Sequence, residues 1–159
     1  MRKLESPEWN EREGPAPNAR RGLSPLVSEY FALVRKVVSN SDASPQKMHG
    51  LRLATKQLRY TLELFRSCYG PGLETRMEEL RELQQLLGDI ADCAATQRTL
   101  SKSVHSKTAR APLKQFLKTR AASNIAKFSK YWNEKFDADG RERWWTSYLE
   151  RSARTPTRR

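Results

Sequence analysis

The chain is poor in the residues on which catalysis and metal binding usually depend. Its two histidines, His49 and His105, are too few for a multi-histidine metal site, and its two cysteines lack metal-ligand spacing. The sequence contains no P-loop, GxGxxG, HExxH, CxxC or GxSxG pattern. We therefore predict no catalytic residue, no metal site and no cofactor, and we interpret the protein as a non-enzyme.

Long apolar runs are absent as well. No stretch approaches the roughly 20 apolar residues that cross a bilayer, which argues against a membrane partner. The opening residues, MRKLESPEWNEREGP, include no apolar segment, so we expect no secretory signal. With only Cys68 and Cys93 present, we expect reduced, structural thiols in a cytoplasmic protein.

Strand patterns are the third absence. No stretch alternates apolar and polar residues with a period of two, whereas apolar residues recur at helical spacing. Ser24-Pro25 and Ser44-Pro45 have the cap-plus-proline pattern of helix starts, and Tyr69-Gly70-Pro71-Gly72 is typical of a helix end. The sequence thus predicts an all-α four-helix bundle with a short C-terminal helix. The predicted helices cover about 24–39, 45–69, 73–104, 111–136 and 141–151.

The chain length suits one domain with short arms. Residues 1–22 are rich in proline and glycine and have few apolar anchors, so they are predicted to form a disordered arm. Residues 23–151 are predicted to form the helical domain, and residues 152–159 a basic disordered tail. Within the fourth helix, one packing face is expected to include Leu113, Phe116, Leu117, Asn124, Phe128 and Tyr131.

Positive charge is concentrated toward the C-terminus. The formal net charge is +12, of which residues 102–159 carry +10. Such an excess favours polyanionic partners such as nucleic acid, polyphosphate or an anionic surface.

A second concentration of charge lies within residues 49–66, whose surroundings are nearly neutral. At about 100° per residue, its basic residues fall within one arc of the predicted helix. We call His49, Arg52, Lys56, Arg59 and Arg66 the basic stripe. Apolar arcs flank it on both sides: Leu51, Ala54, Leu58, Leu62, Phe65 and Tyr69 on one, and Leu53, Tyr60 and Leu64 on the other. Cations between two packing surfaces predict a groove.

A simpler interpretation is a solvated basic face on which Glu63 pairs with Arg59, four residues earlier. Such pairs contribute only about 0.3–0.5 kcal/mol. No acidic residue lies between positions 43 and 62 to balance the cations, which favours an anion site. Periodicity alone leaves both interpretations open.

One stretch resembles the signature of the CHAD family, the conserved-histidine α-helical domain: His49-x-x-Arg52-x-x-x-Lys56-x-x-Arg59-Tyr60-x-x-Glu63-x-Phe65. A second resembles that family's next helix: Leu83-Gln84-x-x-Leu87-Gly88-x-x-x-Asp92. Together they give a specific resemblance over residues 45–104. A weaker similarity runs from Phe116-Leu117-x-x-Arg120 to Trp132-x-x-x-Phe136. Residues 1–22 and 152–159 lie outside the resemblance.

The resemblance implies an all-helical domain that binds inorganic polyphosphate, without catalysis, in a basic groove between two related four-helix halves. It also implies a polyphosphate- or triphosphate-processing enzyme as a partner. The implied binding residues are His49, Arg52, Lys56, Arg59 and Arg66, with Lys114, Lys118 and Arg120 from the fourth helix. Tyr60 and Glu63 are implied to support them, with Glu63 holding a neighbouring guanidinium.

This sequence departs from the family pattern because it contains a single copy of the motif, which resembles the second half of the full domain. A lone half would expose apolar surface, and a homodimer would cover it. We therefore expect a homodimer whose partner completes the groove.

Two competing functions remain from the sequence. Nucleic-acid binding through the basic C-terminal third is the alternative to polyphosphate binding. An enzyme that acts on phosphate chains would need a metal or a nucleophile. Asp89 and Asp92, spaced i and i+3, are the nearest approach to a metal pair, and such pairs more often serve as ion-pair partners.

Overall fold

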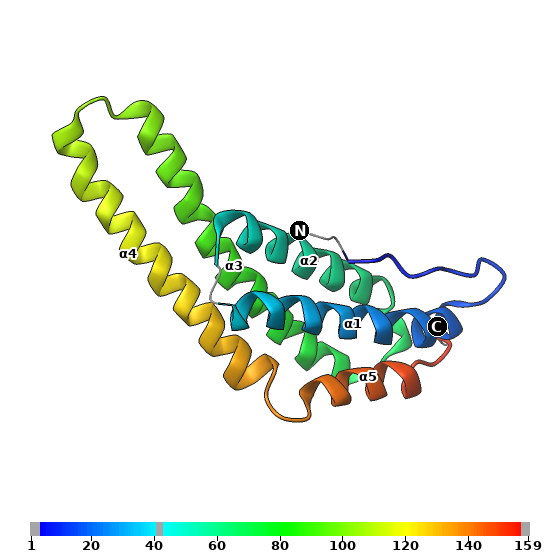
Figure 1. Cartoon of the computed structure of the whole chain (residues 1–159). Helices are drawn as coiled ribbons and strands as arrows, with labels where there is room; N and C mark the ends of the chain where they lie inside the picture. The colour runs from blue at the N-terminus through cyan, green and yellow to red at the C-terminus, as the bar shows by residue number, and fades with distance from the viewer. Residues whose placement is uncertain (1–3, 41–42, 157–159) are drawn as a thin grey trace.

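The computed structural model describes residues 4–40 and 43–156. These residues form helices and no strand (Figure 1). The predicted all-α fold is confirmed. The helices are α1 (Pro15–Ser39), α2 (Pro45–Leu64), α3 (Pro71–Ser103), α4 (Lys107–Tyr131) and α5 (Arg141–Arg151). A 3-10 turn, η1 (Arg66–Cys68), follows α2, and a π-helical segment, η2 (Trp132–Phe136), follows α4.

The start of α1 differs from the prediction. The helix begins at Pro15 after the cap residue Gly14, and Pro25 lies inside it. Ala16, Ala19 and Leu23 extend the apolar spacing of α1 toward the N-terminus and are fully buried. Their packing outweighs the loss of one helical hydrogen bond at Pro25. The prediction of a disordered arm is therefore wrong for residues 15–22.

Residues 4–14 are not helical, but they pack against the helices. Leu4 is buried, and the ring of Trp9 lies 5.0 Å from that of Phe65. The buried amide of Asn18 donates to the carbonyl of Asn10 at 2.9 Å and accepts from its N–H at 2.8 Å. The prediction of disorder is thus also wrong here, because long-range contacts hold the segment. Residues 1–3 of the predicted arm lie outside the described residues.

The boundaries of the middle helices follow the local signals. The Ser44 hydroxyl caps α2 by accepting from the backbone N–H of Lys47 at 3.4 Å, and Pro45 is the first helical residue. Tyr69 and Gly70 separate η1 from α3, whose first residue is Pro71. The long helices α3 and α4 form a hairpin whose tip extends beyond α1 and α2 (Figure 1). The connection between α3 and α4 is shorter than the predicted helix ranges imply, since α4 already begins at Lys107 and not near residue 111.

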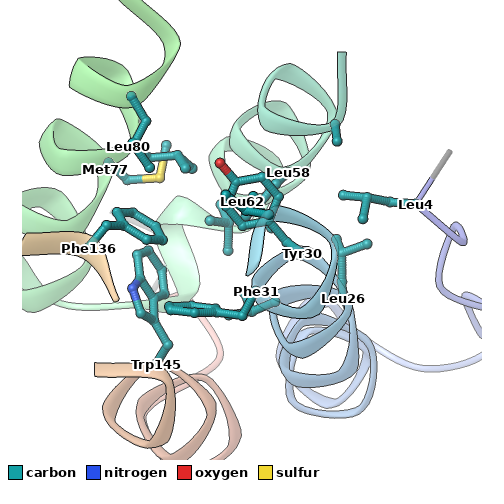
Figure 2. Packing of buried hydrophobic residues seen from close by; sticks show 14 of the residues in the cluster. Leu4, Leu26, Tyr30, Phe31, Leu58, Leu62, Met77, Leu80, Phe136 and Trp145 are labelled. Atoms are coloured by element: carbon teal, nitrogen blue, oxygen red, sulfur yellow. The ribbon is translucent and has the colours of Figure 1, made fainter. Parts of the chain in front are cut away.

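The hydrophobic core lies among α1, α2, α3, η2 and α5 (Figure 2). Phe31, Phe136 and Trp145 are buried at its centre, and the Phe31 and Phe136 rings are 5.4 Å apart. The buried Tyr30 hydroxyl donates to Thr55 at 2.9 Å, and burial raises the pKa of Tyr30. This core holds α2 rigidly against α3, and their junction contains the candidate site.

The C-terminal residues also depart from the prediction. Ala153 is buried, and the backbone N–H of Arg154 donates to the carbonyl of Cys68 at 2.8 Å. The predicted disordered tail is therefore packed over 152–154, and residues 157–159 lie outside the described residues. Cys68 and Cys93 are both buried and form no disulfide.

Candidate functional site

Helix α2 divides into the three arcs that its sequence predicts. Leu51, Ala54, Leu58 and Leu62 are buried against the core, as expected of the larger apolar arc. The smaller arc faces outward: Leu53 is 50% exposed, Tyr60 47% and Leu64 79%. The guanidinium side chains of the basic stripe lie between these arcs and reach toward α3.

A groove of about 450 Å³ runs between α2 and α3. We call it the basic groove; it is lined by Arg52 and Arg59 of α2 and by Arg81, Gln84, Gln85, Gly88 and Asp92 of α3. The two sequence motifs thus meet here, because α2 and α3 pack side by side.

Three neighbours hold the guanidinium of Arg59. Its Nε donates to Oε1 of Gln84 at 2.7 Å, and its Nη1 forms an ion pair with Glu63. Its central carbon lies 4.4 Å from the centre of the Tyr60 ring, a cation–π contact. These contacts fix the direction in which Arg59 presents its remaining donors.

Arg52 differs from Arg59, because no described residue pairs with its charge. Its Nε is buried and has no hydrogen-bond partner within the described part of the chain. The side chain also forms no ion pair with any described residue. A buried guanidinium donor without an acceptor is costly. Arg52 nevertheless lines the basic groove, so its unpaired charge lies on the wall of that groove.

Arg81 is a site residue that the sequence interpretation missed. Its guanidinium pairs with Glu78, and it lies 3.5 Å from Glu74 and 3.7 Å from Glu63. The signal was present in the spacing, since Arg81, Gln84 or Gln85, Gly88 and Asp92 recur every three or four residues along one face of α3. Its acidic partners make it a weaker anion site than Arg52.

Gly88 leaves the middle of this groove open. A Cβ built on Gly88 would meet no atom within 4 Å. The glycine is therefore not required for close packing of another helix within the described chain. Its missing side chain instead leaves the backbone of α3 open to the basic groove.

Comparison with protein families finds that the CHAD domain model matches residues 1–101. The chain belongs to the CHAD family. CHAD domains bind polyphosphate-related ligands, and the family is associated with non-catalytic binding. Comparisons with curated proteins and with solved structures give no match.

The CHAD match differs in extent from the resemblance inferred above. It includes residues 1–22, which had been placed outside, and so contains α1, α2 and nearly all of α3. It ends before α4, so the weaker similarity proposed for residues 116–136 receives no support from it. The basic groove lies wholly within the matched range.

The other members of the basic stripe lie outside the basic groove. His49 is exposed and lines a mainly apolar depression of about 370 Å³ with Met48, Ile90 and Ile125. Lys56 is half-buried and forms no ion pair with a described residue. Arg66 pairs with Glu74 at 2.8 Å near the turn into α3. The structure thus brings Arg52 and Arg59 together and sets His49 and Arg66 toward opposite ends of α2.

The predicted cations of α4 are farther away. Lys114 and Lys118 are exposed and do not line the basic groove. Arg120 lines a separate depression of about 390 Å³, the α3–α4 groove, with Asp89, Asp92, Thr96, Phe116 and Lys127. Asp92 lines both grooves, so they meet at this residue.

The expected packing face of α4 is only partly correct. Leu117, Asn124 and Phe128 are buried, but Leu113 is 46% exposed and Phe116 59%. The N-terminal half of α4 lies beyond α1 and α2, where α3 alone is available to cover it (Figure 1). One helix cannot bury the whole apolar arc of another.

The described residues contain no group of three His, Cys, Asp or Glu side chains arranged to hold a metal ion. None of the helices formed by these residues is both long enough and apolar enough to cross a membrane.

Proposed function

We propose that this CHAD domain binds inorganic polyphosphate, or a similar linear polyanion, in the basic groove without catalysing a reaction. The observation that carries the proposal is Arg52, which lines the basic groove and forms no ion pair within the described part of the chain. A phosphate group is the partner that this guanidinium fits best, because guanidinium and phosphate form charge-assisted hydrogen bonds.

Arg59 and Arg52 would contribute to binding in different ways. Arg59 is already held by Gln84, Glu63 and Tyr60, so little conformational entropy is lost when it meets an anion. Arg52 gains an anionic partner, which no described residue gives it. The two positions are seven residues apart, about 10 Å along the axis of α2, so one phosphate chain can contact both. Lys56 extends the positive charge along α2.

The partner subunit is the second part of the proposal. Leu53, Tyr60 and Leu64 form an exposed apolar row on α2, beside the basic groove. A twofold axis along this row would bury it against its own copy and bring two basic grooves together. We propose that the domain is a homodimer in which each chain provides one wall of the polyphosphate path. An enzyme that makes or consumes polyphosphate or triphosphate is the proposed functional partner.

The test is calorimetric titration of the full chain with polyphosphates of defined length. Arg52→Ala should weaken binding about ten-fold or more, as expected for the loss of a charge-assisted hydrogen bond. Arg52→Ala combined with Arg59→Ala should weaken it further, with helical circular dichroism retained. Arg143→Ala, which removes the same charge from an exposed site on α5, is the matched control. Equal weakening by Arg143→Ala would remove the groove from its proposed role.

One observation favours nucleic acid as a second candidate. Residues 93–133 contain nine lysines and arginines and no acidic residue, and they form most of the projecting hairpin. Competition between long-chain polyphosphate and RNA or DNA, at matched phosphate concentration and salt, separates the two. Preferential binding of nucleic acid that survives Arg52→Ala would favour this candidate.

A further inference from the structure

The α3–α4 groove differs chemically from the basic groove that it adjoins. It is lined by Phe116, a residue that is 59% exposed and whose ring has no ring partner among the described residues. An exposed aromatic ring beside a groove is a group on which a flat ring can stack, whereas a phosphate gains nothing from it. The α3–α4 groove therefore fits a different part of a ligand.

The polar groups of the α3–α4 groove lead to the same conclusion about its ligand. Asp92 supplies carboxylate oxygens, which accept hydrogen bonds from amino groups and repel phosphates. Asp89 adds a second carboxylate, one oxygen of which already accepts from the side-chain amide of Gln85 at 3.0 Å. Exocyclic amino groups of nucleobases are donors of the required kind. Arg120 and Lys127, on the α4 side, form no ion pair with a described residue and offset the two carboxylates. Aromatic stacking and carboxylate acceptors together match a nucleobase.

The two grooves are continuous through one residue. Asp92 lines both, and Gly88, which opens the basic groove, lies one helical turn before it, about 6 Å along α3. A ligand that carries phosphates at one end and a base at the other would cross α3 at this point.

We propose that the domain binds a nucleoside triphosphate, with the phosphates in the basic groove and the base stacked on Phe116 in the α3–α4 groove. The placement of the phosphates rests on the function proposed above, whereas the placement of the base is independent of it. Asp92 contacts the base at the junction, while Arg52 and Arg59 contact the phosphates.

The experiment compares ATP and GTP with inorganic tripolyphosphate, which has the same number of phosphates and no base. At equal salt, at least one nucleotide should bind about ten-fold more tightly than tripolyphosphate, since stacking of one base on an aromatic side chain commonly has this size. Phe116→Ala should remove that advantage and leave tripolyphosphate binding within about two-fold. Because Phe116 is exposed, its truncation leaves the core intact.

Leu113→Ala is the matched control, since it truncates another exposed apolar residue of α4 that does not line the α3–α4 groove. It should change neither affinity, whereas Arg52→Ala should weaken both ligands. Equal affinities for nucleotides and tripolyphosphate, or no effect of Phe116→Ala, would overturn the base site and leave polyphosphate binding in place. Binding of long polyphosphate without binding of any nucleotide would do the same. Failure of long polyphosphate, tripolyphosphate and nucleotides alike would overturn the proposed function itself.

Discussion

The Nε–H of Arg59 donates to the side-chain oxygen of Gln84 at 2.7 Å and so joins α2 to α3 across the basic groove. This contact links the two sequence motifs of the chain. Gln84 and Arg59 both line the basic groove, so the contact lies within the site that we propose for an anion. A glutamine that carries no charge thus holds one of the two arginines of that site.

Replacing Gln84 by alanine should weaken polyphosphate binding without unfolding the domain. The substitution frees one side of Arg59, which remains paired with Glu63, so we expect a loss of affinity of about three- to ten-fold and of stability of about 1 kcal/mol. Titration calorimetry and urea unfolding measure the two effects. Gln115→Ala, an exposed glutamine of α4, is the control for changes at the surface. Unchanged affinity in Gln84→Ala would show that Arg59 does not need this support.

Gly88→Ala should separate stability from binding. An added methyl group meets no atom within 4 Å, and alanine in a helix interior is about 0.5–1 kcal/mol more favourable than glycine, so the unfolding free energy should rise. The same methyl group occupies the basic groove, so polyphosphate affinity should fall several-fold. Thermal unfolding tests the predicted gain in stability, and calorimetry tests the predicted loss of polyphosphate affinity.

Gly140→Ala should lower stability and leave binding unchanged, in contrast to Gly88→Ala. Gly140 has a φ of 77°, which disfavours alanine, and it lies between η2 and α5, away from the basic groove. This variant should lose stability and keep its affinity for polyphosphate. A Gly88→Ala variant that binds as well as the parent would show that the ligand does not approach the backbone of α3.

The helix boundaries that the sequence predicts correctly are those with strong local signals. Ser44-Pro45 and Gly70-Pro71 mark real ends because capping and the missing proline N–H act within one turn. Ser24-Pro25 has the same pattern inside α1, where the buried residues Ala16, Ala19 and Leu23 decide the outcome. Local chemistry cannot reveal that Trp9 packs on Phe65, 56 positions away.

For the candidate site as well, the sequence reveals what lies within one helix but not the contacts between helices. The helical wheel places Arg52 and Arg59 on one face of α2, and the structure brings both into one groove. The partners of these residues depend on the register between α2 and α3, which no single helix contains. Arg81 and Gln84 were therefore missed as site residues, and His49 was assigned to a surface that lies beyond the end of the groove.

Gly22→Ala should destabilise the domain, in contrast to Gly88→Ala. A Cβ at position 22 would lie 2.8 Å from the Cβ of Pro7 and 2.8 Å from the ring of Trp9. The N-terminal segment would have to move, and such overpacking commonly costs about 1–3 kcal/mol. Urea unfolding measures the effect. If residues 4–14 were detached in solution, Gly22→Ala would instead stabilise α1 by about 1 kcal/mol.

Leu64→Lys should dissociate the proposed homodimer. Leu64 is the most exposed member of the apolar row on α2, at 79%, so a lysine there does not disturb the core of one subunit. At a twofold contact it would place two like charges in an apolar interface, and dissociation should follow. Light scattering at micromolar concentration should change from dimer to monomer, and polyphosphate affinity should fall because the wall of the polyphosphate path that the second chain provides is lost. Leu113→Lys, at a comparably apolar site on α4, should leave the dimer intact. A parent protein that is monomeric under these conditions and still binds polyphosphate would show that one chain forms the whole site.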